Sequence, residues 1–251
     1  MEIVEGIVLR QVNYGESDRI LSVFTRECGR IDGKARAVRK SAKRFAGRMD
    51  IFSQVRLTLD RRRGRINFKE AQLLEGWMGI RADLLRLSWA AAMGELVLAL
   101  YGENEPHPRA YELLLLTLHL LDGEAEPTLG TLCILELRFL EEAGLLPQLG
   151  ACIQCGEGVS AARRFLFWPE LGGLVCAPCR PQAGGMEIPL GTLKGVTLGL
   201  RFPINRLARL HLDTHGLEHL RVAVTRFLAF HLGRELKARH FLEGILVGGQ
   251  K

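Results

Sequence analysis

Two closely spaced pairs of cysteines constrain the fold of this chain more than any other feature of its sequence. Cys152 and Cys155 enclose two residues, Cys176 and Cys179 enclose two more, and residues 156–175 separate the pairs. Each C-x2-C turn can direct two sulfurs at one ion, and four thiolates suit the tetrahedral preference of zinc. Four sulfurs also close the coordination sphere to water. We therefore predict one structural Zn²⁺ ion, which stabilises a fold and activates no substrate.

Disulfide bonds and a redox-active pair are two alternative roles for these cysteines. Disulfides would require an oxidising compartment, and residues 1–5 show no beginning of a secretory signal. A redox pair at residues 176–179 would stand at a strand-to-helix junction and would lack a matching second pair. Cys28 and Cys133 stand alone, and we expect them to be small buried side chains.

The length and hydropathy of the chain indicate a globular protein. Its 251 residues permit a hydrophobic core that needs no disulfides. No apolar stretch reaches the ~20 residues that a membrane helix requires. We therefore expect a cytoplasmic protein with no membrane partner.

The first 75 residues have the pattern of short strands separated by turns. The expected strands are residues 3–12, 20–25, 31–38, 54–60 and 65–74. Five such strands with one long basic connection predict a small antiparallel barrel. The OB-fold is the commonest five-stranded barrel that binds nucleic acid.

After residue 80 the composition changes to Leu- and Ala-rich segments that predict helices. The expected helices are residues 83–101, 108–121 and 128–143, and helical periodicity resumes from Leu217. A Cys- and Gly-rich stretch interrupts them at about 150–185. The predicted fold is therefore multi-domain α+β: an OB-fold barrel at residues 1–80 and a helical bundle at 81–251 with an embedded four-cysteine zinc module.

The positive charge of the chain lies almost entirely in the predicted barrel. Residues 1–80 hold 17 Lys and Arg against 10 Asp and Glu, a net of +7, whereas the whole chain carries +6. This asymmetry is typical of a domain with a polyanionic partner, and a solvated basic surface is the alternative that charge alone leaves open.

Two basic clusters within the barrel are the candidate nucleic-acid contacts. The first comprises Lys34, Arg36, Arg39, Lys40, Lys43, Arg44 and Arg48, and the second comprises Arg61, Arg62 and Arg63. Alternation would place Lys34 and Arg36 on one face of a strand. Two basic hairpins on one barrel face form a groove that can follow a phosphate backbone, with strong salt dependence. Tyr14 or Phe45 can offer a base-stacking face, although the better interpretation of Phe45 is an anchor for its loop.

The absence of common catalytic motifs argues against an enzyme. The sequence contains no Gly-rich phosphate loop, no nucleophile elbow and no paired acidic motif for catalytic magnesium. Residues 215–219 fit the H-x-x-E-H pattern of inverzincin peptidases. That motif, however, opens an expected helix with Asp213 or Thr214 as N-cap, so helix-surface histidines are the better interpretation.

Three blocks of sequence resemble one known family. Residues 6–9 and 14–18, followed by Thr25 and Gly29, are similar to the opening of the RecO family of DNA repair and recombination mediators. Residues 37–47 look like its basic motif, and residues 231–239 are similar to its terminal-helix motif. The chain departs from the family pattern at Val38, at residues 50–51 and in its unusually basic run at residues 61–63.

The resemblance implies a function. It implies binding to single- and double-stranded DNA, annealing of complementary strands, and partnership with RecR and with single-stranded DNA-binding protein. It further implies help in loading RecA, no nucleotide cofactor, no enzymatic activity, and a cytoplasmic, nucleoid-associated location.

The partner site is predicted from the chemistry of the partner. Bacterial single-stranded DNA-binding proteins end in an acidic, apolar tail, which needs an apolar cleft edged by cations. One candidate wall is the helix that carries Arg138, expected to face outward, and the other is the last helix with Arg234, Lys237 and Arg239. The competing hypothesis for the whole chain is an RNA-binding or transcription-associated zinc protein with the same barrel.

Overall fold

The structure is a computed structural model that describes residues 1–38, 45, 49–123, 128–181, 184–209 and 213–248. The chain forms two compact units, Met1–Gly123 and Glu124–Lys251. The first unit includes helices that follow the barrel. The expected domain boundary between residues 80 and 81 therefore stays a prediction.

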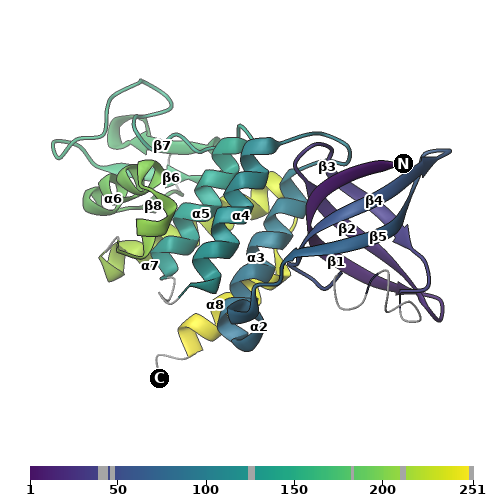
Figure 1. The fold of residues 1–251 in the computed structure, drawn as a ribbon. Coiled ribbons are helices and arrows are strands. Elements are labelled where there is room, and N and C mark those ends of the chain that lie inside the picture. Colours follow the sequence, from purple (N-terminus) through teal and green to yellow (C-terminus); the bar gives the residue numbers. More distant parts are fainter. Residues whose placement is uncertain (39–44, 46–48, 124–127, 182–183, 210–212, 249–251) are drawn as a thin grey trace. The chain divides into compact units, whose positions relative to one another are not determined.

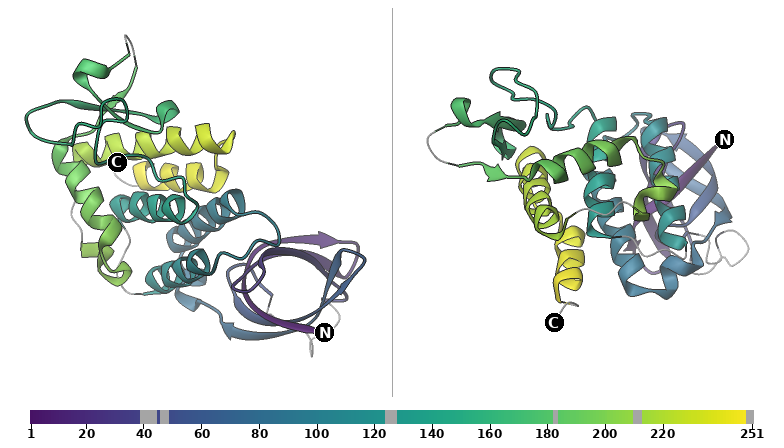
Figure 2. Two further views of the ribbon diagram at one scale, coloured as in Figure 1. Left: turned by 90° about the horizontal axis from the view of Figure 1, so that it is seen from above. Right: turned by 90° about the vertical axis from the view of Figure 1, so that its left-hand side faces the viewer.

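Five strands form a closed barrel in the first unit, as the sequence pattern predicts (Figures 1 and 2). They are β1 (Glu2–Tyr14), β2 (Asp18–Thr25), β3 (Gly29–Ala35), β4 (Gln54–Arg62) and β5 (Arg65–Glu75). Their order around the barrel is β1-β2-β3-β5-β4, and β4 pairs with β1 to close it. All pairs are antiparallel except β3 with β5, which is parallel.

The barrel core follows from the period-2 alternation of its strands. In β3, every second side chain from Gly29 to Ala35 is buried, and the residues between them are partly exposed. Phe45, from the basic connection between β3 and β4, is 1% exposed and belongs to this core. The interpretation of Phe45 as an anchor is thus confirmed, and its ring is not available for stacking on bases.

Among the described residues, the first unit also contains the helices α2 (Met78–Ala82), α3 (Leu84–Leu100) and α4 (Pro108–Asp122). The carboxylate of Asp83 caps α3, and Pro108 occupies the first turn of α4. Helix α3 contacts β1 and α4 contacts β2. The helices therefore cover part of the outer barrel surface, where Phe24 lies 5.5 Å from Tyr101 between ring centroids.

The second unit contains helices around a small sheet. Its elements are α5 (Leu129–Glu142), β6 (Phe165–Trp168), η1 (Pro169–Leu171), β7 (Gly173–Cys176), η2 (Ala177–Cys179), β8 (Met186–Glu187), α6 (Leu190–Arg201), η3 (Ile204–Arg209), α7 (Thr214–Leu232) and α8 (Lys237–Gly248). The sheet has the order β7-β6-β8, and α7 contacts α5, α6, η1 and β8. Asp213 is the N-cap of α7, because its carboxylate accepts the Gly216 N–H at 2.9 Å. Within the described ranges, no helix is both long and apolar enough to span a membrane.

Candidate metal centre and nucleic-acid interface

The two cysteine pairs come together at one point of the second unit. Cys152 and Cys155 lie in the loop before β6, Cys176 ends β7, and Cys179 ends η2. A backbone hydrogen bond from Ile153 N to Leu174 O, 2.9 Å long, fastens the first turn to the strand that carries the second. As a result, all four Sγ atoms lie within 4.8 Å of one another.

The geometry of the cluster fits a tetrahedral metal. With metal–sulfur bonds of about 2.3 Å, two thiolates of a tetrahedral zinc site are about 3.8 Å apart. Cys155 Sγ and Cys176 Sγ are separated by 3.7 Å. All six cysteines are free thiols, so the cluster is not a disulfide. Nor does Cys176 open an α-helix, as a redox pair would, because η2 is a single 3₁₀ turn.

The electrostatics of the cluster also favour a cation. Burial raises the pKa of the Cys152 thiol, but the N–H groups of Cys176, Cys155 and Gln154 outweigh it and lower that pKa to about 6. The neighbouring sulfurs of Cys176 and Cys155 raise the pKa of Cys179 to about 12. The protein alone therefore favours the Cys152 thiolate and disfavours those of Cys155 and Cys179, whose pKa values are both raised by neighbouring sulfurs. A bound divalent cation would remove that penalty.

The first basic cluster is only partly described, and one expectation about it is wrong. Strand β3 ends at Ala35, so Lys34 and Arg36 do not share a strand face. The physical reason is a tight turn in which Ala37 has φ 54° and its N–H donates to Asp18 Oδ1 at 2.9 Å. Arg36 is exposed, and Lys34 Nζ pairs with Asp18 Oδ2 at 2.9 Å.

The remaining members of the first cluster lie outside the described residues. They are Arg39, Lys40, Lys43, Arg44 and Arg48. Their part in nucleic-acid binding stays a prediction.

The second basic cluster forms the β4–β5 hairpin, as expected. Arg63 and Gly64 both have positive φ and make the turn, which suits a two-residue hairpin loop. Arg61 pairs with Glu2 at 2.9 Å, and Arg62 pairs with Asp60 at 2.8 Å. Arg62 is nevertheless 80% exposed, so this surface pair leaves it accessible.

Strand pairing brings Lys34 of the first cluster and the β4–β5 hairpin of the second cluster to one outer surface of the barrel. Lys34 of β3 lies beside Asn67 of β5, and Arg65 of β5 lies beside Arg62 of β4. Lys69 continues this surface at an irregularity in the β4–β5 register. It stands outside both basic runs of the sequence, so the sequence pattern did not indicate it. We call this surface the basic face: Lys34, Arg36, Arg62, Arg63, Arg65 and Lys69. Among the described residues, Arg36, Arg63 and Arg65 form no ion pair.

The outward orientation expected for Arg138 is wrong. Its guanidinium is half-buried and donates to the carbonyl oxygens of Gly199, at 2.6 Å, and Phe202. These carbonyls belong to the last turn of α6 and its C-cap, where the helix leaves acceptors unsatisfied. Burial also lowers the pKa of Arg138. This residue therefore fastens α6 to α5 within the unit.

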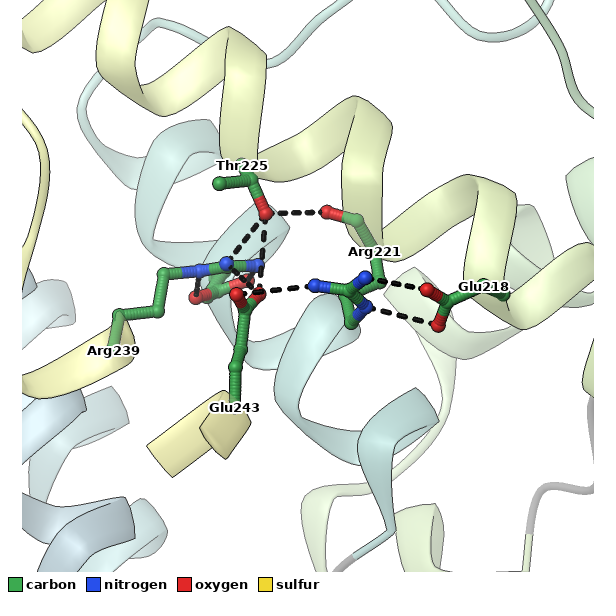
Figure 3. A network of polar contacts seen from close by, with 6 residues as sticks. Glu218, Arg221, Thr225, Arg239 and Glu243 are labelled. Carbon is green, nitrogen blue, oxygen red and sulfur yellow. Dashed lines mark hydrogen bonds and ion pairs between the residues drawn. The ribbon is translucent and has the colours of Figure 1, made fainter. Parts of the chain in front are cut away.

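The expected surface role of Arg239 is also wrong. Arg239 is 3% exposed, and its guanidinium donates to both carboxylate oxygens of Glu136, at 2.5 and 3.1 Å. Figure 3 shows the same guanidinium against Glu243 and Thr225, with Arg221 joining Glu243 to Glu218. Arg234 and Lys237 are exposed, and their role in partner binding stays a prediction.

The H-x-x-E-H pattern forms no three-ligand site among the described residues. His215 and His219 lie on α7 with ring centroids 4.5 Å apart, but the Glu218 carboxylate is engaged by Arg221 Nε at 2.9 Å. Among all the residues that the structure describes, the four cysteines are the one group of three or more close side chains that could hold a metal ion.

Comparison with protein families identifies the chain. The family model described as "Recombination protein O N terminal" matches residues 1–77, and "Recombination protein O C terminal" matches residues 81–240. The chain belongs to the RecO family. Within this RecO family member, the block at residues 14–18 forms the β1–β2 turn, and the terminal block supplies the buried Arg239.

Several RecO relatives align over nearly their whole length. A DNA repair protein RecO from Anaeromyxobacter sp. (strain Fw109-5) is 36% identical over 245 residues, which cover 96% of this chain and 94% of the relative. Those of Symbiobacterium thermophilum and Myxococcus xanthus are 33% and 34% identical. They cover 96% and 95% of this chain, and the same shares of the two relatives.

Proposed function

We propose that this protein is a non-enzymatic recombination mediator of DNA repair. It binds single- and double-stranded DNA, anneals complementary strands, and helps to load RecA onto single strands coated with single-stranded DNA-binding protein. The observation that carries the proposal is the basic face of a closed five-stranded barrel in a RecO family member. Such a DNA-binding role places the protein at the nucleoid, in the cytoplasm.

The basic face supports annealing by reducing the repulsion between two polyanions. Each phosphate that a Lys or Arg neutralises releases condensed counterions, so binding follows the backbone and falls steeply with salt. Arg36, Arg63 and Arg65 supply cations that form no ion pair with a described carboxylate. Their guanidinium groups can each present two parallel N–H donors to a phosphate. No covalent step is required.

We further propose that the four cysteines hold one Zn²⁺ ion with a structural role. The donor set of four sulfurs and the 3.7 Å separation of Cys155 and Cys176 support it. The ion would hold the loop before β6 to the end of β7 and to η2. Because all four positions are occupied by protein, the ion would activate no water.

Neutralising the basic connection is expected to slow strand annealing. Replacing Arg39, Lys40, Lys43 and Arg44 together with Ala should lower the magnitude of the salt slope for single-strand binding by up to about 3. Annealing of oligonucleotides coated with single-stranded DNA-binding protein, measured by fluorescence quenching without ATP, should slow in parallel. The matched control replaces Arg206, Arg209, Arg226 and Arg180, which lie in the second unit. Unchanged DNA affinity at moderate salt would contradict the assignment of the basic connection.

We propose a third candidate for the partner site, an apolar groove in the second unit. Its volume is about 370 Å³. It is lined by Leu149, Val159, Leu193 and Leu198, with Lys194 and Arg201 at its edge. Both cations are exposed and form no ion pair within the described part of the chain. We propose that it receives the acidic, apolar tail of single-stranded DNA-binding protein, with RecR binding elsewhere.

Reversing the charge at this groove is expected to weaken tail binding. The double variant Lys194→Glu and Arg201→Glu should bind a labelled tail peptide about thirtyfold less tightly, since two lost contacts worth about 1 kcal/mol each come to about 2 kcal/mol. Fluorescence anisotropy measures the affinity. Arg226→Glu, an exposed charge on α7, is the control. Wild-type affinity in the double variant would remove this groove as the tail site.

An RNA-binding role is the second candidate function, because the basic face would also attract an RNA backbone. Measuring the affinity of the protein for DNA and RNA single strands of the same sequence distinguishes the DNA-binding role from the RNA-binding role. Tighter binding to RNA without annealing activity would favour the alternative.

A further inference from the structure

An apolar patch on the outer barrel surface lies next to the basic face. Tyr14 and Val12 of β1 and Ile20 of β2 are 53%, 43% and 38% exposed. The register places Val12 directly opposite Ile20, and Tyr14 opposite Asp18. Leu21 is buried in the barrel core, so Ile20 and its partners point outward. We call Val12, Tyr14 and Ile20 the strand patch.

The patch is bare although the rest of the same hairpin is covered. Nearer its other end, β1 and β2 contact α3 and α4, and Ile7, Leu9 and Phe24 are buried. Apolar side chains gathered on an exposed sheet face, beside cations, mark an interaction surface. Their alternation with polar residues shows that they are not needed for the barrel core.

Cations border the patch on the neighbouring strand. The register sets Lys34 of β3 beside Ile20, and Lys34 Nζ lies 4.3 Å from the centroid of the Tyr14 ring. Asp18 Oδ2 holds the same ammonium at 2.9 Å. The contacts therefore fix the orientation of the ring while leaving about half of it exposed. Arg36 follows in the turn after β3.

We propose that the strand patch binds unstacked bases of single-stranded DNA, with Tyr14 as the stacking platform. The inference rests on the proposed DNA-binding function and adds the contact that distinguishes single strands from duplexes. Phosphates would lie along the basic face, and the bases would turn toward Tyr14, Val12 and Ile20. A duplex keeps its base faces stacked inside, so it can use the cations but not the patch. Backbone binding alone would not need an exposed ring beside two exposed aliphatic side chains.

Removing the ring is expected to weaken single-strand binding selectively. Tyr14→Ala should lose about tenfold in affinity for a fluorescein-labelled single strand, whereas affinity for a duplex of the same sequence should change less than about twofold. Tyr14→Phe keeps the ring and should bind like wild type. Phe230→Ala is the matched control, because Phe230 is also 53% exposed but lies on α7. Circular dichroism checks that each variant is folded.

A strand of abasic nucleotides separates stacking from an indirect effect on Lys34. On that strand, which offers phosphates but no bases, Tyr14→Ala and wild type should bind equally. A 5-iodouracil strand irradiated with the wild-type protein should crosslink to the peptide that contains Tyr14. Equal losses on single, abasic and double strands, or no loss on any, would overturn the inference while leaving the proposed function intact. Absence of DNA binding by the wild-type protein would overturn both.

Discussion

Replacing Cys176 with serine is expected to abolish metal binding and unfold the zinc module. Cys176 is fully buried at the end of β7, and its Sγ lies 3.7 Å from that of Cys155. Structural zinc contributes on the order of 10 kcal/mol of apparent binding free energy in small zinc modules, and that energy is coupled to folding. Elemental analysis should find one zinc per wild-type chain and none in Cys176→Ser.

Limited proteolysis locates the unfolding. New cleavage sites in Cys176→Ser, and in wild type treated with a strong chelator, should fall between Gly150 and Gly185. Cys28→Ser is the control, because Cys28 is a half-buried residue of the barrel unit and lies outside the cluster. Wild-type protein that contains no metal, or a Cys176→Ser variant with unchanged protease resistance, would refute the structural zinc site.

Removing Arg239 is expected to be the most damaging substitution in the helical bundle. Arg239→Leu leaves the carboxylate of Glu136 buried without its cation, whereas Glu243 keeps its ion pair with Arg221 at 3.1 Å. Breaking a buried ion pair by deleting one partner costs about 3–5 kcal/mol of unfolding free energy. Urea denaturation followed by circular dichroism measures the loss. Arg226→Leu, at an exposed position of α7, should change stability by less than about 0.5 kcal/mol.

The loss in Arg239→Leu should grow as pH increases. Burial raises the pKa of Glu136 above its ordinary value of 4.5, and Arg239 opposes that rise. Without Arg239 the pKa rises further, so the folded state of the variant binds more protons than its unfolded state. Stability that is fully present below the unfolded pKa is then lost as pH rises through the folded pKa. The difference between wild type and variant should therefore be larger at about pH 8 than near pH 5.

A second substitution tests the cause. Adding Glu136→Leu to Arg239→Leu removes one uncompensated buried carboxylate, and replacing buried ions with apolar groups is often neutral or stabilising. The double variant should regain part of the lost stability and most of the pH dependence should disappear. A double variant that is less stable than Arg239→Leu, with the same pH dependence, would contradict the account of the network.

Local features of the sequence were sufficient to predict the barrel strands and the cluster of four cysteines. Strand alternation and turn residues act within a few positions, so the five strands lie close to their expected bounds. Cysteine chemistry is equally local, because each C-x2-C turn prepares two ligands before the pairs meet. The N-cap at Asp213 and the hairpin turn at Arg63 follow from the same short-range rules.

The availability of each charged side chain was decided only by the tertiary structure. The local sequence predicts Arg239 to be a surface cation on an amphipathic helix. In the structure it is buried against Glu136, which lies 103 residues earlier in the chain. Arg138 donates hydrogen bonds to carbonyl oxygens at the end of α6. Lys34 of β3 forms an ion pair with Asp18 of the neighbouring strand β2. The parallel pairing of β3 with β5, which joins the two basic clusters, is also a long-range contact. The sequence by itself determined the local elements and the two cysteine pairs, because those depend on neighbouring residues. The fold determined which cations face solvent, because burial and ion pairing depend on residues that only folding brings together.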